Sequence, residues 1–108
     1  MMKWSVPHAQ VMMNAERNLL SLEGMVSFDT AARLANEGRR LLTQADKNGA
    51  LSIDVRGVQN SSSATLTVVL EWWRALDALQ LSLKAIYFPE QMEPLVSLSG
   101  LNRILPEH

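Results

Sequence analysis

Three consecutive hydroxyl side chains, those of Ser61, Ser62 and Ser63, mark the junction between a strand-like and a helix-like stretch of the sequence. Serine is a preferred helix N-cap, because its oxygen accepts a hydrogen bond from a free backbone N–H of the first turn. A serine here can also accept a phosphate, since the positive end of a helix tolerates added negative charge. The third alternative is that these residues border a surface on which a partner docks.

Other residue types that carry out catalysis are scarce. The two histidines, His8 and His108, lie near the ends of the sequence, and there is no cysteine. A zinc site, a thiol nucleophile and a Ser-His-Asp triad are therefore all poorly supported. The stretch RGVQNSSS contains one glycine and no lysine, so it does not resemble a phosphate-binding P-loop. We expect neither catalysis, nor a cofactor, nor a bound metal ion.

The charge balance argues against nucleic acid as a partner. Ten basic and eleven acidic residues give a net charge of −1, which provides no broad cationic surface for a phosphate backbone. No apolar run approaches the ~20 residues that cross a bilayer, so we expect no direct membrane insertion. The N-terminal stretch lacks signal-peptide features, and the absence of cysteine fits a reducing compartment. These features predict a cytoplasmic protein.

The hydropathy pattern predicts an α/β fold in a single domain over residues 1–108. Strand-like alternation and helical periodicity follow one another along the chain, which implies crossover connections and parallel pairing in part of the sheet. The result would be a mixed sheet of about four strands. The predicted strands are residues 10–14, 18–26, 50–58 and 81–88, and the predicted helices are 31–46, 64–79 and 90–99.

Particular residues are expected to bound the first of these helices. Ser27 or Asp29 is the predicted N-cap, and Gly49 is the predicted left-handed C-cap. Gly38 falls on the apolar stripe of the helix, although glycine costs about 1 kcal/mol relative to alanine there. We interpret Gly38 as a point where the helix approaches the sheet closely.

The helix predicted over residues 64–79 has an unusually wide apolar side. At the helical angular spacing, its apolar arc covers about 220°, whereas an ordinary surface helix has an apolar stripe of about 100° or somewhat more. Trp72 lies on the expected core face, while Leu66, Leu70 and Trp73 form a flank beside it. Either another helix covers this flank or a partner does. Tryptophan is enriched at binding hot spots, so Trp73 is the favoured partner contact.

Three stretches together resemble the STAS domain family: NLLSLEGMVSFDTAARL, LSIDVRGV and NSSSATLTVVL. The resemblance extends over about residues 19–106 and implies a STAS-type mixed sheet with alternating helices. Two branches of the family compete. One contains anti-sigma-factor antagonists, which are controlled by phosphorylation of a serine in a partner-switching pathway. The other contains the small STAS subunits of Mla-type ABC phospholipid transporters, and the chain is similar to this MlaB-like branch throughout.

The resemblance also assigns roles to individual residues. Ser63 matches the hydroxyl residue of the family's regulatory loop, and Ser62 replaces the aspartate that usually precedes it. Ala64 and Thr65 replace small residues of the family pattern. The loss of the aspartate weakens the phosphorylation hypothesis, but Ser63 remains a candidate phosphoacceptor. The predicted regulatory or partner-contact loop consists of Asn60, Ser61, Ser62, Ser63, Ala64 and Thr65.

The MlaB-like resemblance implies a function without catalysis. Such a subunit would bind and support the transporter's ATPase and, through it, the permease, in a system that maintains the lipid asymmetry of the outer membrane. It would lie in the cytoplasm and associate with the inner membrane through this complex. The loop and the flank of Leu66, Leu70 and Trp73 are the predicted contacts with the ATPase.

Overall fold

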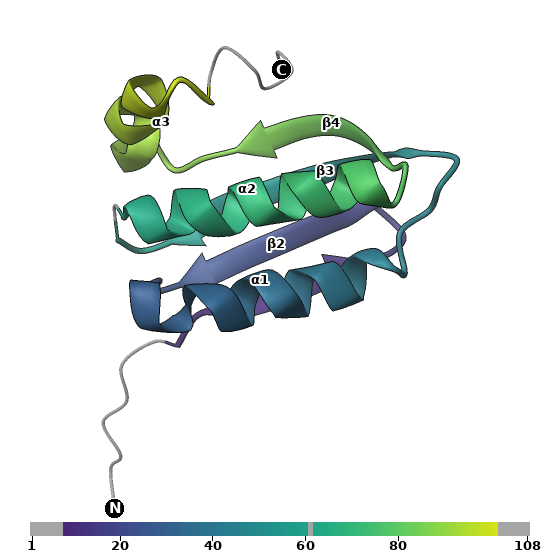
Figure 1. Ribbon diagram of the computed structural model, residues 1–108, viewed down its shortest axis with the longest axis horizontal. Coiled ribbons are helices and arrows are strands. Elements are labelled where there is room, and N and C mark those ends of the chain that lie inside the picture. The colour runs from purple at the N-terminus through teal and green to yellow at the C-terminus, as the bar shows by residue number, and fades with distance from the viewer. Residues whose placement is uncertain (1–7, 61, 102–108) are drawn as a thin grey trace, which may run out of the picture.

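The computed structural model describes residues 8–60 and 62–101, and these form a four-stranded sheet with helices along one face (Figure 1). The strands and helices alternate after the first hairpin, as the hydropathy pattern predicts. Their bounds are β1 Gln10–Asn14, β2 Leu19–Gly24, α1 Phe28–Leu42, β3 Ala50–Val58, α2 Ser63–Ala78, β4 Ser82–Tyr87, the 3-10 helix η1 Glu90–Met92 and α3 Glu93–Ser99.

The sheet is mixed, which confirms the predicted α/β architecture. Its strand order is β1-β2-β3-β4; β1 is antiparallel to β2, and β2, β3 and β4 are parallel. Parallel neighbours require crossover connections, which α1 and α2 provide. The carboxyl ends of β2, β3 and β4 therefore meet at one end of the sheet, together with the first turns of α1 and α2 (Figure 1). We call this the docking end.

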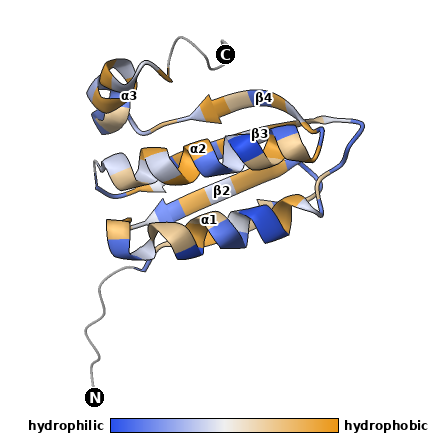
Figure 2. Cartoon of the chain, in the orientation of Figure 1, coloured by the Kyte–Doolittle hydropathy of each residue, from blue (hydrophilic) through white to orange (hydrophobic). Residues whose placement is uncertain are grey.

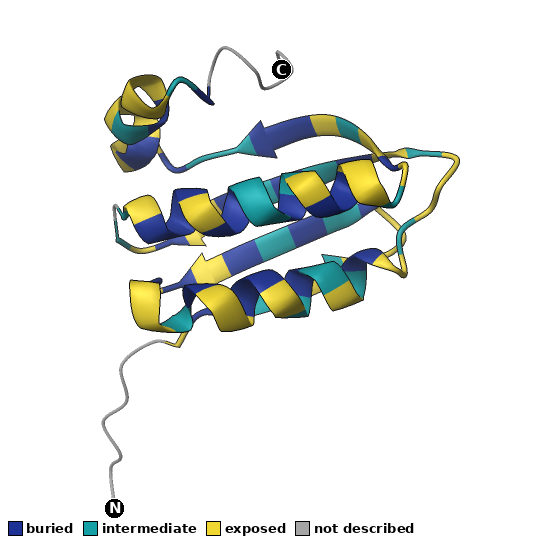
Figure 3. Cartoon of the chain, in the orientation of Figure 1, coloured by how far each residue is buried: buried dark blue, intermediate teal, exposed yellow. Residues whose placement is uncertain are grey.

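The core lies between the sheet and the two long helices. Leu20 and Leu22 of β2 and Leu51, Ile53 and Val55 of β3 point toward the helices and are buried. The alternate positions of β3 are more exposed, which is the period-2 pattern expected of a strand with one covered face. Figures 2 and 3 show the same division on the helices, where buried apolar positions alternate with exposed polar ones. No described helix has both the length and the apolarity needed to span a membrane.

Gly38 marks a close approach, but to a helix and not to the sheet. A Cβ added at Gly38 would lie 2.0 Å from Nε1 of Trp72 on α2. That indole is fully buried and donates a hydrogen bond to the backbone oxygen of Leu34 at 3.3 Å. The predicted close approach is confirmed, and the predicted partner is wrong, because the large indole of α2 occupies the space above the glycine.

The first helix begins as predicted and ends early. Ser27 is its N-cap residue, but the helix stops at Leu42 and Gly49 has no positive φ. The predicted left-handed cap is therefore wrong. The segment directly after Leu42 forms turns through backbone bonds, such as the one from the N–H of Ala45 to the oxygen of Leu42 at 3.1 Å. A long-range contact fixes the next residue, because the Asn18 side chain donates to the backbone oxygen of Asp46 at 3.2 Å and accepts from its N–H at 3.0 Å.

The last helix ends as predicted. Gly100 has a φ of +78° and forms a left-handed C-cap for α3. Between β4 and α3 the chain makes the single turn η1 after Pro89, and Pro94 lies in the first turn of α3, where its missing N–H is tolerated. This compact segment packs near the first turns of α2 at the docking end (Figure 1).

Candidate partner-contact site

The loops that follow β2 and β3 are tied together by one side chain. The amide oxygen of Asn60 accepts from the backbone N–H of Val26 at 3.0 Å, and the amide nitrogen of Asn60 donates to the backbone oxygen of Val26 at 2.8 Å. Gln59 adds a backbone bond, because its N–H donates to the oxygen of Gly24 at 2.9 Å. Asn60 is therefore a half-buried clamp between two loops, and its amide is already engaged within the chain.

Ser62 caps helix α2. Its Oγ accepts a hydrogen bond from the N–H of Ala64 at 3.1 Å, and its extended backbone, with φ −147° and ψ 135°, is typical of an N-cap residue. The capping interpretation of the serines is thus confirmed for Ser62.

Ser63 is the first residue of α2, and it is exposed. Its backbone oxygen accepts from the Thr67 hydroxyl at 3.2 Å. No acidic residue occupies the first turn of α2, so no side-chain carboxylate there offsets the partial positive charge of the helix end. Ser63 is therefore accessible to a partner or to a kinase, and its role in either remains a prediction. Ser61, the first serine of the predicted loop, lies outside the described residues.

Ala64 and Thr65 do not belong to the surface loop. Both are fully buried within the first turn of α2, so neither side chain is available to a partner in this fold. The prediction that Ala64 and Thr65 belong to a contact loop is therefore corrected: both are core positions of α2. Thr65 is unusual among the described residues, because its buried Oγ1 has no hydrogen-bond partner there. Such a group costs about 1–3 kcal/mol relative to a satisfied one.

The flank of α2 is mostly covered by α3. Leu66 is 7% exposed and packs with Met92, Val96 and Leu101, while Leu70 is half-buried against the same cluster. The alternative that another helix covers this flank therefore applies to Leu66, which is not a surface residue. Trp73 is also half-buried and packs against the main core. Leu70 and Trp73 keep partial exposure, and their contact with a partner remains a prediction.

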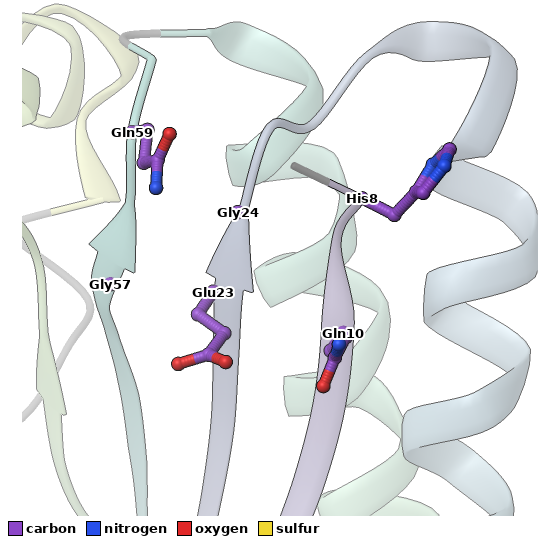
Figure 4. Close-up of a pocket in the computed structure, with 6 residues that line it drawn as sticks. All are labelled: His8, Gln10, Glu23, Gly24, Gly57 and Gln59. Carbon is purple, nitrogen blue, oxygen red and sulfur yellow. The ribbon is translucent and has the colours of Figure 1, made fainter. Parts of the chain in front are cut away.

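A shallow pocket opens at the docking end, where β1 begins and β2 and β3 end (Figure 4). Its volume is about 280 Å³, and its lining is mainly polar. The ring of His8 points away from the carboxylate of Glu23, so these two groups do not converge on a common point (Figure 4). Across the described residues, no group of three acidic, histidine or cysteine side chains is placed to hold a metal ion. The pocket lining is His8, Gln10, Glu23, Gly24, Gly57 and Gln59.

Asp54 on β3 is held in an ion pair with Arg56. Arg56 donates two hydrogen bonds to the Asp54 carboxylate, at 3.0 and 2.9 Å, and these bonds lower the pKa of Asp54 below its ordinary value. The Arg56 guanidinium also lies 4.8 Å from the centroid of the Tyr87 ring. The carboxylate is thus held in an internal ion pair, which is a structural role.

The sequence reasoning missed two exposed apolar residues at the docking end. Met25 and Phe28 flank the start of α1, and their side chains are 39% and 68% exposed. A signal was present in the sequence, because MVSFD places large apolar residues on both sides of a cap serine, outside the stripe that faces the core.

Comparison with known protein families supports the resemblance seen in the sequence. A family model described as "Mlab, STAS domain" matches residues 9–106, and this range includes every described strand and helix. No curated protein matches the sequence. The four-stranded mixed sheet with alternating helices is the fold expected for this family. The chain therefore belongs to the MlaB-type STAS domain family.

Proposed function

We propose that this chain is a non-catalytic subunit that binds and supports the ATPase of an Mla-type ABC phospholipid transporter. In this role it contributes to the lipid asymmetry of the outer membrane. It reaches the permease, and hence the inner membrane, through the ATPase. The observation that carries the proposal is the match to the MlaB-type family over residues 9–106.

The geometry of the docking end supports this proposal. Ser63 is exposed at the start of α2, and the clamp between Asn60 and Val26 holds the neighbouring loops in fixed positions. A contact surface that is rigid before binding loses little conformational entropy when a partner docks. Ser62 uses its hydroxyl as a cap, which leaves Ser63 as the accessible hydroxyl of the described pair. A fixed docking contact suits these features better than a phosphorylation switch.

Co-purification with the ATPase subunit of the same organism's Mla-type transporter tests the proposal. The wild-type chain should co-elute with the ATPase, and Ser63→Arg should weaken binding at least tenfold by adding bulk to the contact. Ala78→Arg is the matched control, because Ala78 is exposed at the other end of the same helix. Thermal unfolding of both variants shows whether the fold is retained. Failure of the wild-type chain to bind the ATPase would contradict the proposal.

Intact-mass analysis of the chain from native cells separates this function from a partner switch. A static subunit should show the unmodified mass, and Ser63→Ala should bind the ATPase as well as the wild type does. A phosphate on Ser63, together with loss of ATPase binding on modification, would instead support a phosphorylation-controlled contact.

A further inference from the structure

Phe28 is an exposed aromatic side chain on a rigid support. It is the first residue of α1 and is 68% exposed, although it lies next to a well-packed core. Met25, three residues earlier, is also exposed, and between them Val26 is buried and fixed by its two hydrogen bonds to Asn60. The backbone between Met25 and Phe28 is therefore fixed by the two hydrogen bonds of Val26 to Asn60.

Acidic residues lie at the same end of the sheet as these apolar residues. Glu23 is the penultimate residue of β2, two positions before Met25, and Asp29 follows Phe28 in the first turn of α1. Both carboxylates are exposed, and neither takes part in an ion pair within the described residues. Two further exposed acids, Glu90 and Glu93, begin η1 and α3 at the same end of the sheet (Figure 1).

His8 lies at this end, where its backbone pairs with Met25, but four exposed carboxylates outnumber it, and the described arginine and lysine residues do not neutralise them. Arg33 and Arg56 are each engaged in an ion pair, with Glu37 at 3.0 Å and Asp54 at 2.9 Å. Arg39 and Arg74 both pair with Glu71, and Lys84 lies in the first half of β4. Arg17, Arg40 and Lys47 lie beyond the opposite end of the parallel strands, in the β1–β2 turn, the last turn of α1 and the loop before β3. The docking end thus combines exposed apolar side chains with unpaired negative charge.

We propose that Phe28 and Met25 insert into an apolar depression that is bordered by arginine or lysine side chains on the ATPase. This inference rests on the proposed function and specifies the chemistry of its contact. Charge decides among the occupants of this surface. A second copy of the chain would bring the same carboxylates face to face, and an anionic lipid surface would repel them. A basic protein surface satisfies both the apolar and the acidic side chains, and aromatic residues are typical hot spots of such contacts.

Binding of purified variants to the purified ATPase, measured by calorimetry, tests this proposal. The first test variant is Phe28→Ser, and its control is Met12→Ser, because Met12 is an exposed apolar side chain in the middle of β1. The second test variant is Met25→Ser, and its control is again Met12→Ser. The two methionine side chains are exposed to nearly the same extent, 39% for Met25 and 42% for Met12. The third comparison uses double variants, each of which removes two negative charges. The test variant combines Glu23→Gln and Asp29→Asn, and the control combines Glu16→Gln and Asp77→Asn.

The expected result is a rise in Kd of at least tenfold for Phe28→Ser and of about threefold or more for Met25→Ser, with the controls within twofold of wild type. The double charge variant at Glu23 and Asp29 should bind more weakly at low salt and lose much of the salt dependence seen for the wild type. Light scattering of the free chain should show a monomer at the same concentration.

Three results would overturn the inference and leave the proposed function standing. The first is wild-type affinity in Phe28→Ser and Met25→Ser while Ser63→Arg still disrupts binding. The second is an unchanged salt dependence in the double charge variant. The third is that Phe28→Ser abolishes dimerisation or vesicle binding of the chain but leaves ATPase binding unchanged, which would assign the surface to a second copy or to lipid. Absence of any binding by the wild-type chain would contradict the proposed function itself.

Discussion

Gly38 of α1 and Trp72 of α2 are in such close contact that a single added methyl group at Gly38 would overlap the indole, 2.0 Å from Nε1. The two helices meet at this point, and the indole N–H donates to the backbone of Leu34 one turn earlier. The relative position of the first turns of α1 and α2, which present Phe28 and Ser63, therefore depends on a glycine in the middle of a helix.

Substitution of Gly38 by alanine should destabilise the protein by up to about 2 kcal/mol. Overpacking in a filled core costs about 1–3 kcal/mol, and the helical preference of alanine over glycine returns only about 1 kcal/mol. Urea unfolding of the variant measures the difference. Gly49→Ala is the control, because its added Cβ would meet the nearest atom, Oδ2 of Asp46, at an ordinary 3.5 Å. Equal stability of the two variants would contradict the close contact.

Removal of the Asn60 clamp should cost about 2–3 kcal/mol. The change Asn60→Ala deletes two hydrogen bonds and leaves the N–H and oxygen of the partly buried Val26 backbone without these partners. The measurement is chemical unfolding, combined with hydrogen exchange of the Val26 amide, which should become faster. Asn48→Ala serves as the control, since that side chain is exposed. An unchanged exchange rate at Val26 would show that the amide does not hold this loop.

Replacement of Thr65 by valine should stabilise the protein by about 1 kcal/mol. The substitution keeps the branched shape and removes a fully buried hydroxyl that has no partner among the described residues. Thr67→Val is the matched control on the same helix, because Thr67 is exposed and the effect there should stay within about 0.5 kcal/mol. Destabilisation by Thr65→Val in thermal unfolding would mean that the hydroxyl is satisfied in solution.

Acid should selectively weaken the ion pair of Asp54. Hydrogen bonds from Arg56 lower the pKa of Asp54 in the folded chain below its ordinary value of 3.8. The folded state therefore binds fewer protons there than the unfolded state, and the pair stabilises the protein fully only above that value. The stability advantage of wild type over Asp54→Asn should be constant near neutral pH and shrink as the pH falls below about 4. Unfolding free energies measured from pH 7 down to pH 3 would show it, and a pH-independent difference would contradict the pair.

Local patterns predicted the elements well. The strict alternation of Leu51, Ile53 and Val55 placed β3 at its observed bounds of Ala50–Val58. Ser27 and Ser62 were among the predicted cap residues, with Asp29 and Ser63 as the alternatives, because capping depends on neighbours within the first turn. The resemblance began at residue 19, whereas the family match begins at residue 9 and takes in β1, whose short QVMMN pattern is a weak strand signal.

Long-range contacts account for what the sequence did not reveal. The backbone of Asp46, where the sequence predicted a continuing helix, is bonded to Asn18, 28 residues away, and no local pattern reports that contact. The wide apolar arc of α2 does not reveal whether another helix covers Leu66, so Leu66 was predicted to contact a partner. In the structure α3 and its neighbouring residues cover it. Thr65 and Ala64 were assigned to a loop because the family pattern marks that motif as regulatory, while the helix already begins at Ser63.

The Asn60 clamp also sets an order of events. It joins residues 34 positions apart, so it forms only after β2 and β3 have come together and both loops have reached their final places. Until then, neither Ser63 nor Phe28 is presented in a defined position, and a nascent or partly folded chain has no complete surface to offer. Under the proposed function, binding to the ATPase would thus favour chains that have finished folding, without a separate checking step.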